Sequence, residues 1–368
     1  MTNERALPAR VQDLVAELVR IDSTSGTPGE EVALQYVTRW LEQEGSDRGV
    51  LTQIMSADGQ AAVMLTPTDA ARQMLLFSGH IDVVPISDRA AWSHDPFGAN
   101  LVNDQMVGRG TSDMKSGLAA AMIAVTTLLG EGIPAGLLVT TGEEIGCRGA
   151  AAAADTLASL PIGAVIVPES TAGAVLLGHR GALWLRVTMR GKAAHGSTPE
   201  RGVNAIERAA AVIARMPQMP TRSHPHLGRE SVNVGTIHAG VVPNIVPDQC
   251  EIQVDIRVVS DPAPLLSWWK GQPEVSEVTV ELDLSPVWTP SDHPWVACLG
   301  APISSAAASY FTDASVLTRV LRPGTPVVVW GPGEPSAVHT VNESVPLASV
   351  PAALAHYLRV GRAWGTLP

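Results

Sequence analysis

The amino-acid sequence predicts an α/β protein in which a doubly wound, mostly parallel sheet carries an inserted ferredoxin-like α+β domain. Short apolar runs alternate with helix-like segments in the first and last parts of the chain, as in parallel sheets covered by helices. Between about residues 182 and 285, apolar side chains instead recur at every second position, which is typical of half-buried antiparallel strands. At 368 residues, the chain also exceeds the size at which a single core stops growing.

The chain is expected to open with two amphipathic helices. Apolar residues between positions 11 and 19 follow the spacing of one helical face, and a second such pattern covers positions 32–41. Thr27 can cap the second helix, Pro28 suits its first turn, and Glu30 stands three residues after the cap. Together these three residues form a capping-box signature.

Four apolar runs are expected to form buried, largely parallel strands. They are Met74–Phe77, Leu137–Val139, Val165–Val167 and Val327–Trp330. A helix predicted at Gly117–Leu129 would cross between strands. That run is too short for the ~20 residues of a bilayer span, so we expect a core helix and no membrane partner.

The middle of the chain predicts the element order βαββαβ, which is that of a ferredoxin-like domain. The predicted elements are strands at 183–189, 231–237, 250–258 and 275–284, with helices at 204–215 and 265–269. We therefore expect one domain in two parts, 1–180 and 288–368, interrupted by an inserted domain at 181–287.

Charge and composition exclude some classes of partner. A formal net charge of −11 without a basic stripe argues against nucleic acid. Residues 1–10 are charged and lack the apolar segment of a secretory signal, which predicts a cytoplasmic protein. Three widely separated cysteines without CxxC spacing suit reduced thiols.

An acid or a histidine follows each of the four buried strands. These residues are His80 and Asp82, Glu143 and Glu144, Glu169, and His339. Because the carboxyl ends of parallel strands meet at one edge of a sheet, we expect these side chains to converge. Asp113, just before the long helix, is a further candidate, although an Asp there is ordinarily a helix cap.

Two imidazoles and three carboxylates without thiolates suit divalent zinc, manganese or cobalt. Two such ions carry +4 against −3 from Asp113, Glu144 and Glu169, a balance that favours a bridging hydroxide between two metals. Asp82 could orient the His80 imidazole from behind; the alternative is a plain turn residue. Glu143, whose side chain should diverge from that of Glu144, could move protons; the alternative is a pair of solvated glutamates.

Two residues of the inserted domain are candidate substrate contacts. His195 lies in a glycine-bearing loop, where a structural role is the default. Arg257 lies on the polar face of the strand at 250–258, and its guanidinium suits a substrate carboxylate, although a solvated arginine is equally ordinary there.

Taken together, several motifs resemble the di-zinc metallopeptidase family of acetylornithine deacetylase, succinyl-diaminopimelate desuccinylase, aminoacylase and glutamate carboxypeptidase. The motifs are SGHIDVVP at 78–85, GRGTSDMK at 108–115, TGEE at 141–144, GHRG at 178–181, PNIVP at 243–247, DIR at 255–257, TDAS at 312–315 and GPG at 331–333. The resemblance covers nearly the whole chain. A single glycine in Ala239-Gly240 and a short helix containing Pro264 depart from the family pattern.

The resemblance implies a role for each candidate. Asp113 would bridge two zinc ions, with His80 and Glu169 completing one site and Glu144 and His339 the other. Glu143 would be the general base and Asp82 would orient His80. His195 would reach the oxyanion in the partner subunit's site, while Asn244 and Arg257 hold the substrate. The inserted domain would be the lid and the homodimer surface.

The expected reaction is metal-dependent removal of an acyl group from an N-acyl amino acid, with water activated between two metals and Glu143 as base. A dipeptidase or carboxypeptidase acting on a short peptide is the alternative within the same class. An inactive binding or regulatory homologue is the alternative from another class, because a fold does not guarantee chemistry.

Overall fold

The computed structural model describes residues 6–44, 47–56, 59–69 and 72–366. The chain forms two compact units. The first, here called the core unit, comprises Met1–Gly178, Val287–Ala307 and Thr312–Pro368; the second, here called the inserted unit, comprises His179–Pro286 and Ala308–Phe311.

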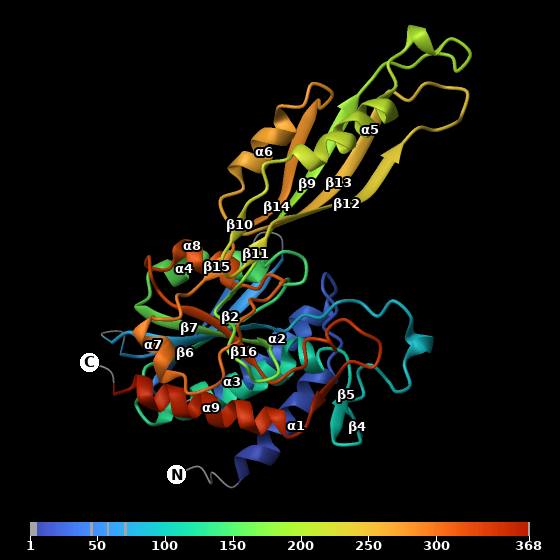
Figure 1. The fold of residues 1–368 in the computed structure, drawn as a ribbon. Helices are drawn as coiled ribbons and strands as arrows, with labels where there is room; N and C mark the ends of the chain where they lie inside the picture. The colour runs from blue at the N-terminus through green and yellow to red at the C-terminus, as the bar shows by residue number, and fades with distance from the viewer. Residues whose placement is uncertain (1–5, 45–46, 57–58, 70–71, 367–368) are drawn as a thin grey trace. The chain divides into compact units, whose positions relative to one another are not determined.

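A six-stranded sheet forms the centre of the core unit (Figure 1). Its strands, in spatial order, are β1 (Gly49–Met55), β2 (Ala61–Pro67), β6 (Ala135–Thr140), β3 (Met74–His80), β7 (Ile162–Ser170) and β16 (Val327–Gly331). The last four run parallel to one another. At the other edge, β2 is antiparallel to β6 and β1 is antiparallel to β2. The predicted mostly parallel sheet is therefore confirmed.

Helices cover both faces of this sheet, which confirms the doubly wound arrangement. One face packs against α1 (Leu7–Val19), α2 (Gly29–Glu44), α3 (Ser116–Gly130) and α9 (Ser349–Trp364). The other face packs against α4 (Arg148–Ala158) and α8 (Ala314–Val320). A shorter helix, α7 (Pro294–Cys298), adds Trp295 and Val296 to the first of these cores.

The apolar runs are continuous because each central strand contributes to both cores. On β3, Leu75 and Phe77 belong to the core beneath α1 and α3, whereas Met74 and Leu76 belong to the core beneath α4 and α8. Successive side chains of a strand point to opposite faces, so a strand buried on both sides needs apolar residues throughout.

Several parts of the core unit were not predicted from the sequence. They include the helices α4, α7, α8 and α9 and the edge strands β1 and β2. They also include a small sheet of β4 (Asn100–Val102), β5 (Gln105–Val107) and β17 (Ser344–Pro346). Three-residue strands carry too little periodicity to be recognised.

Across the described ranges, no helix combines the length and the apolar character that a bilayer crossing requires.

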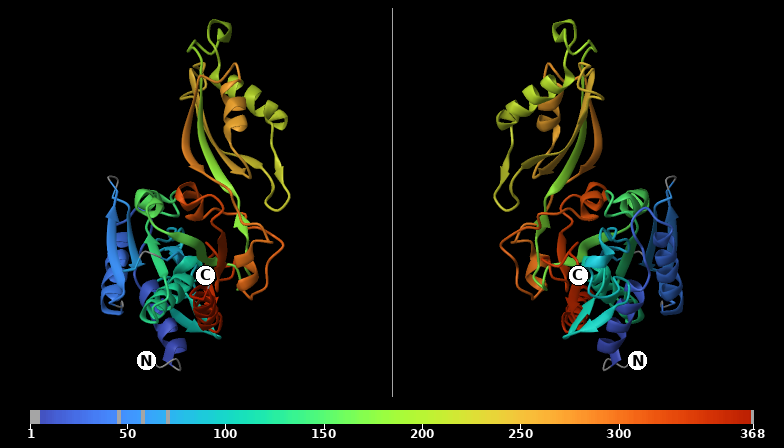
Figure 2. Two further views of the ribbon diagram at one scale, coloured as in Figure 1. Left: turned by 90° about the vertical axis from the view of Figure 1, so that its left-hand side faces the viewer. Right: turned by 90° about the vertical axis from the view of Figure 1, so that its right-hand side faces the viewer.

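The inserted unit has the predicted ferredoxin-like order. Its elements in sequence are β9 (Gly181–Arg190), α5 (Ala205–Arg215), β12 (Ser231–Ala239), β13 (Gln249–Val258), α6 (Ala263–Lys270) and β14 (Glu277–Leu284). The strands form one antiparallel sheet in the order β12-β13-β9-β14. Both helices cover the same face of it (Figures 1 and 2), where Val212, Leu265 and Trp269 are buried against alternate residues of β9 and β13.

Candidate metal centre

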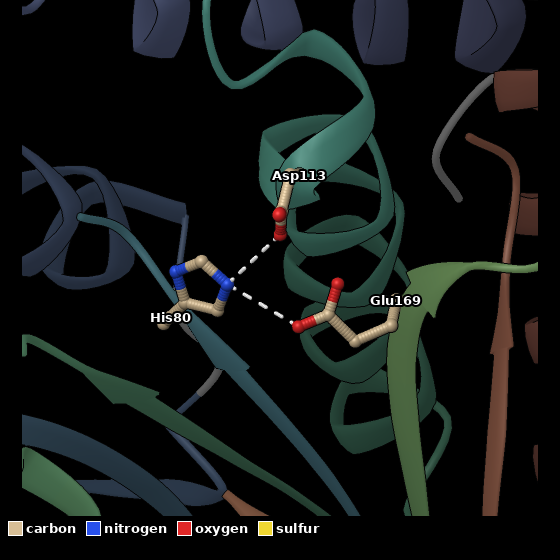
Figure 3. A group of neighbouring side chains, drawn as sticks. All are labelled: His80, Asp113 and Glu169. Atoms are coloured by element: carbon tan, nitrogen blue, oxygen red, sulfur yellow. Dashed lines mark hydrogen bonds and ion pairs between the residues drawn. The ribbon is translucent and has the colours of Figure 1, made fainter. Parts of the chain in front are cut away.

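Asp113 lies at the centre of two groups of possible metal ligands. Its Oδ1 lies 3.2 Å from His80 Nε2, and its Oδ2 lies 3.0 Å from His339 Nε2. Glu169 Oε1 approaches the same nitrogen of His80 at 3.2 Å, and Glu144 Oε1 approaches that of His339 at 3.0 Å. In each group one ligand atom per residue lies within 4.8 Å of the others, and Figure 3 shows the first group.

The sheet brings the two groups together. His80 ends β3 and Glu169 lies near the end of the parallel strand β7, so both side chains emerge at the carboxyl edge of the sheet. Glu144 follows β6, and His339 lies in the loop after β16. Asp113 lies in the segment Thr111–Lys115 that leads into α3, and its own backbone is extended, with φ of −113° and ψ of 94°.

Glu343 supports the turn that carries Asp113. This fully buried carboxylate accepts hydrogen bonds from the backbone N–H groups of Ser112 and Asp113, both at 2.9 Å. Its other oxygen accepts one from Arg109 Nη1 at 2.6 Å. Glu343 was not predicted as a site residue, because no motif or spacing in the sequence distinguishes this loop glutamate from a solvated one.

Asp82 links His80 to the turn of Glu143 and Glu144. The backbone carbonyl of Asp82 lies 2.9 Å from His80 Nδ1, and the Asp82 carboxylate is 3.5 Å from the same nitrogen. A carbonyl can only accept, so Nδ1 carries a proton, and in the neutral imidazole Nε2 presents its lone pair to the acids. The Asp82 carboxylate also accepts the N–H groups of Glu143 and Glu144, at 3.2 Å each.

Burial and the concentration of negative charge shift the pKa values of the candidate metal ligands. Burial, followed by the charge of Asp113, raises the pKa of Glu169 to about 8, and the same causes raise that of Glu144. Hydrogen bonds to Asp113 and Glu144 raise the pKa of His339 to about 10. Burial alone would raise the pKa of Asp113, but hydrogen bonds from His339 and His80 leave it below its ordinary value.

Glu143 is buried beside these ligands. Its relative exposure is 5%, and Cys147 Sγ lies 3.8 Å from its Oε1. Burial raises the pKa of Glu143 well above its ordinary value; the charges of Glu144, Asp313 and Glu169 add to the shift, while that of His80 opposes it. A carboxyl group in this setting can hold a proton taken from water and release it again.

The donor set fits divalent metal ions. Each group offers one imidazole nitrogen and carboxylate oxygens, the ligand types that zinc, cobalt and manganese accept. The two oxygens of Asp113 face different groups, so this residue can serve two ions at once. Cations there would also offset the excess negative charge that the raised pKa values reflect.

The remaining predicted site residues lie in the inserted unit. His195 is exposed, and its Nδ1 accepts the N–H of Ser197 at 3.1 Å, so the neutral ring carries its proton on Nε2. The backbone oxygen of Asn244 accepts a hydrogen bond from Gly196 at 2.8 Å, which places Asn244 beside His195. Arg257 donates from Nε to Asp255 at 3.1 Å and stacks on Phe311.

Comparisons with known proteins agree with this architecture. Residues 177–266 match a family described as a peptidase dimerisation domain. The succinyl-diaminopimelate desuccinylase 1 of a Ruegeria species is 31% identical over 293 residues, which cover 74% of each chain. A succinyl-diaminopimelate desuccinylase of Cereibacter sphaeroides is 30% identical over 381 residues, covering 94% of this chain and 97% of that protein.

Solved structures with the same fold include an M20 family metallo-carboxypeptidase from Sulfolobus solfataricus, with a TM-score of 0.80 at 18% identity and complete coverage of both chains. A dinuclear metal binding peptidase of the M20 family from Bacillus subtilis gives 0.68 at 14% identity, covering 97% of this chain and 98% of that one. Fold, relatives and ligand set together define a metal-dependent hydrolase of amide or peptide bonds. Within that class, the chain belongs to the M20 metallopeptidase family.

Proposed function

We propose that this protein removes an acyl group from an N-acyl amino acid, using two divalent metal ions, with zinc as the leading candidate and cobalt or manganese as alternatives. The observation that carries the proposal is the pair of ligand groups that share Asp113. His80 and Glu169 would complete one metal site, and Glu144 and His339 the other.

When bound, two such ions supply an activated water at neutral pH and polarise the carbonyl of the scissile amide. Glu143 would act as the general base, taking the proton of that water and later delivering it to the leaving amine. General acid–base assistance of this kind contributes roughly 10²- to 10⁴-fold. Asp82 would keep His80 oriented and, through two backbone N–H groups, keep Glu143 in place.

A substrate with a free carboxylate suits Arg257. Neither Nη group of its guanidinium makes a hydrogen bond with any residue in the described ranges, so both can bind a carboxylate in the bidentate manner. The curated relatives are named desuccinylases, which favours an N-succinyl or other N-acyl amino acid. The solved structures named as a metallo-carboxypeptidase and as a peptidase keep a short peptide as the second candidate substrate.

The deciding experiment measures release of free amine from N-succinyl amino acids, N-acetyl amino acids and dipeptides. Chelator-stripped protein would be compared with protein resupplied with zinc, cobalt or manganese. Metal-restored hydrolysis of an N-acyl amino acid is expected, and a preference for dipeptides would assign the alternative. Metal binding without turnover on any substrate would favour the inactive homologue, although both ligand groups and Glu143 are intact.

We further propose a homodimer formed through the inserted unit. The matched dimerisation domain supports it. So do the apolar side chains around one hollow beside the loop between β12 and β13, where Val241 is 94% exposed and Val242, Ile245 and Ile206 are also exposed. Contiguous exposed apolar surface of this kind marks protein interfaces. Light scattering after size-exclusion chromatography would give the subunit number directly.

The length of β13 supports a site shared between subunits. His195 and Asn244 lie in the paired loops beyond the Gln249 end of β13, whereas Arg257 lies near its other end, opposite Ala182. Eight residues of extended strand span about 27 Å, which is longer than an N-acyl amino acid. One substrate can therefore touch Arg257 and His195 together only if His195 comes from a second subunit.

Mixing two inactive variants tests this arrangement. Equal amounts of Glu143→Ala and His195→Ala chains would be denatured together and refolded. Half of the resulting dimers would be heterodimers, and each heterodimer would contain one site that has both Glu143 and His195. About a quarter of wild-type activity is expected after random pairing. No recovery, despite heterodimers detected by a tag on one chain, would show that His195 acts within its own subunit.

A further inference from the structure

The turn that carries Glu143 and Glu144 is held from two sides by carboxylates that are not themselves candidate ligands. Three consecutive backbone N–H groups, those of Gly142, Glu143 and Glu144, each donate to a buried carboxylate. Asp82 accepts the second and third of these bonds, at 3.2 Å each. Glu30 accepts the first, through Oε1 at 3.0 Å.

Glu30 connects this turn to two other segments of the core unit. Its Oε2 accepts hydrogen bonds from the backbone of Gly26 at 2.9 Å and from Gln60 Nε2 at 3.4 Å. The side chain of Gln60 in turn accepts from the hydroxyl of Thr141 at 2.9 Å, the residue just before the turn. One carboxylate at the start of α2 thus joins the loop before that helix, the start of β2 and the turn after β6.

The loop before α2 also contacts Asp82, the second carboxylate that holds the turn. Ser25, next to Gly26, donates from its hydroxyl to Asp82 Oδ2 at 2.8 Å. Glu30 and Asp82 therefore hold the turn together with the loop at residues 24–27, and movement of either carboxylate would be felt by both segments.

The packing leaves the turn little freedom to adjust. Gly142 has φ of +67°, and a Cβ atom at this position would lie 2.3 Å from Gln60 Oε1. Glu30 itself is only 6% exposed, so its hydrogen bonds are not replaced by water when one is lost. Burial, followed by the charge of Asp82, raises the pKa of Glu30, and the N–H groups that it accepts oppose that shift.

We propose that Glu30 is a positioning residue whose two carboxylate oxygens fix the placement of Glu143 and Glu144, and through Glu144 the affinity of one metal site. The proposal rests on the proposed function for the roles of these two glutamates. Glu30 touches neither substrate nor metal; it acts through the backbone of Gly142. Partners of this indirect kind typically change metal affinity or activity by about 10- to 100-fold.

The test compares Glu30→Gln with Glu31→Gln. An amide keeps one acceptor oxygen and replaces the other with an NH₂ group, so in either orientation a donor faces a backbone N–H of Gly142 or Gly26. Glu31 is the matched control, because it is the next residue of the same helix turn, is exposed, and bonds only to Gln35 among the described residues. Glu30→Asp, which keeps the charge but is one methylene shorter, is the second variant if Glu30→Gln does not fold.

Co²⁺ titration of chelator-stripped protein, followed by its visible absorption, reads each binding step without a substrate. The expected result for Glu30→Gln is two bound Co²⁺, one with wild-type affinity and one weakened about 10- to 100-fold. On the best substrate of the panel, kcat should fall by a similar factor while KM is unchanged. Glu31→Gln should match the wild type in every measurement.

The outcomes separate this inference from the proposed function. Equal Co²⁺ affinities and kcat in Glu30→Gln and the wild type would overturn the positioning role and leave the proposed function standing. Equal weakening of both metal sites with a lower melting temperature would also overturn it, since that is the result of general destabilisation. A wild type that binds two Co²⁺ but hydrolyses nothing would contradict the proposed function alone, because the effect on affinity would still be measured.

Discussion

Glu169 is one of the groups that make the stability of the metal-free protein depend on pH. Burial also raises the pKa values of Glu143 and Glu144, so their contributions add to that of Glu169. Burial and the charge of Asp113 raise the pKa of this carboxyl group from 4.5 to about 8 in the folded protein. A group whose folded pKa lies above its unfolded value favours folding at low pH, and this advantage is lost as pH rises through the folded pKa. Between pH 5 and pH 7, which lie inside the window from 4.5 to about 8, the contribution of Glu169 to the free energy of unfolding falls by about 1.36 kcal/mol per pH unit, or about 3 kcal/mol over the two units.

The perturbation is removal of metal combined with Glu169→Gln. For a domain of the size of the core unit, a loss of about 3 kcal/mol in the free energy of unfolding corresponds to a melting temperature about 6 to 12 °C lower at pH 7 than at pH 5. The stripped Glu169→Gln protein should lose less of its stability over this interval, because an amide does not titrate. Glu31→Gln, which changes an exposed glutamate, should follow the wild type.

Resupplying metal should reverse the slope. Metal ions compete with protons for His80, Glu169 and their neighbours, so the loaded protein is expected to gain stability as pH rises from 5 to 7. The assay is calorimetric or fluorescence-detected melting at pH 5, 6 and 7, with and without zinc. If the stripped Glu169→Gln protein lost as much stability as the stripped wild type, Glu169 would not be the source and the reasoning would be refuted.

Three further substitutions test the site. Glu143→Gln should lower kcat by roughly 10²- to 10⁴-fold with unchanged zinc content by metal analysis, and near-normal turnover would exclude it as the base. Glu343→Gln should destabilise the protein by about 3–5 kcal/mol in urea titrations, because it breaks a buried pair with Arg109; the less buried Glu334→Gln should have little effect. Gly142→Ala should lower both kcat and melting temperature, since its φ of +67° costs an L-residue about 1–2 kcal/mol; a fully active, equally stable Gly142→Ala protein would contradict the packing of this turn.

The sequence predicted the arrangement of the core unit well, because its strands are buried on both faces and their ends carry the polar residues. His80 and Glu169 were predicted to lie close together because the carboxyl ends of parallel strands meet at one edge of a sheet. In the structure His80 Nε2 lies 3.2 Å from Glu169 Oε1. The edge strands β1 and β2 were missed. On β1 the apolar residues are partly exposed, so the periodic signal is weak. On β2 residues 62–65 form a short buried apolar run, which periodicity alone does not distinguish from a buried helical segment.

Residues that act through tertiary contacts could not be predicted. Glu30 matched a capping box, a local interpretation that explains a glutamate three residues after Thr27. In the structure its carboxylate bonds the N–H groups of Gly26 and of Gly142, which is 112 positions away. Glu343 carried no signal at all, since its partners at Arg109 and Asp113 are more than 200 positions distant. No local pattern contains information about contacts of that range.

The supports of this site share one chemical device, and it has a consequence for how the site tolerates change. Glu30, Asp82 and Glu343 each accept two backbone N–H groups, and together they fix the turns at residues 112–113 and 142–144 that hold three of the functional acids. A backbone N–H group can only donate a hydrogen bond and cannot accept one. Replacing such a carboxylate with its isosteric amide therefore places a donor against a donor in a buried position, which costs more than the loss of a charge alone. At these three positions the conservative change to Asn or Gln should thus be more damaging than the same change at an exposed acid. At Glu30 and Asp82 both oxygens accept backbone N–H groups, so the new donor meets the main chain. At Glu343 one oxygen accepts both backbone N–H groups, so the new donor meets the Arg109 guanidinium instead.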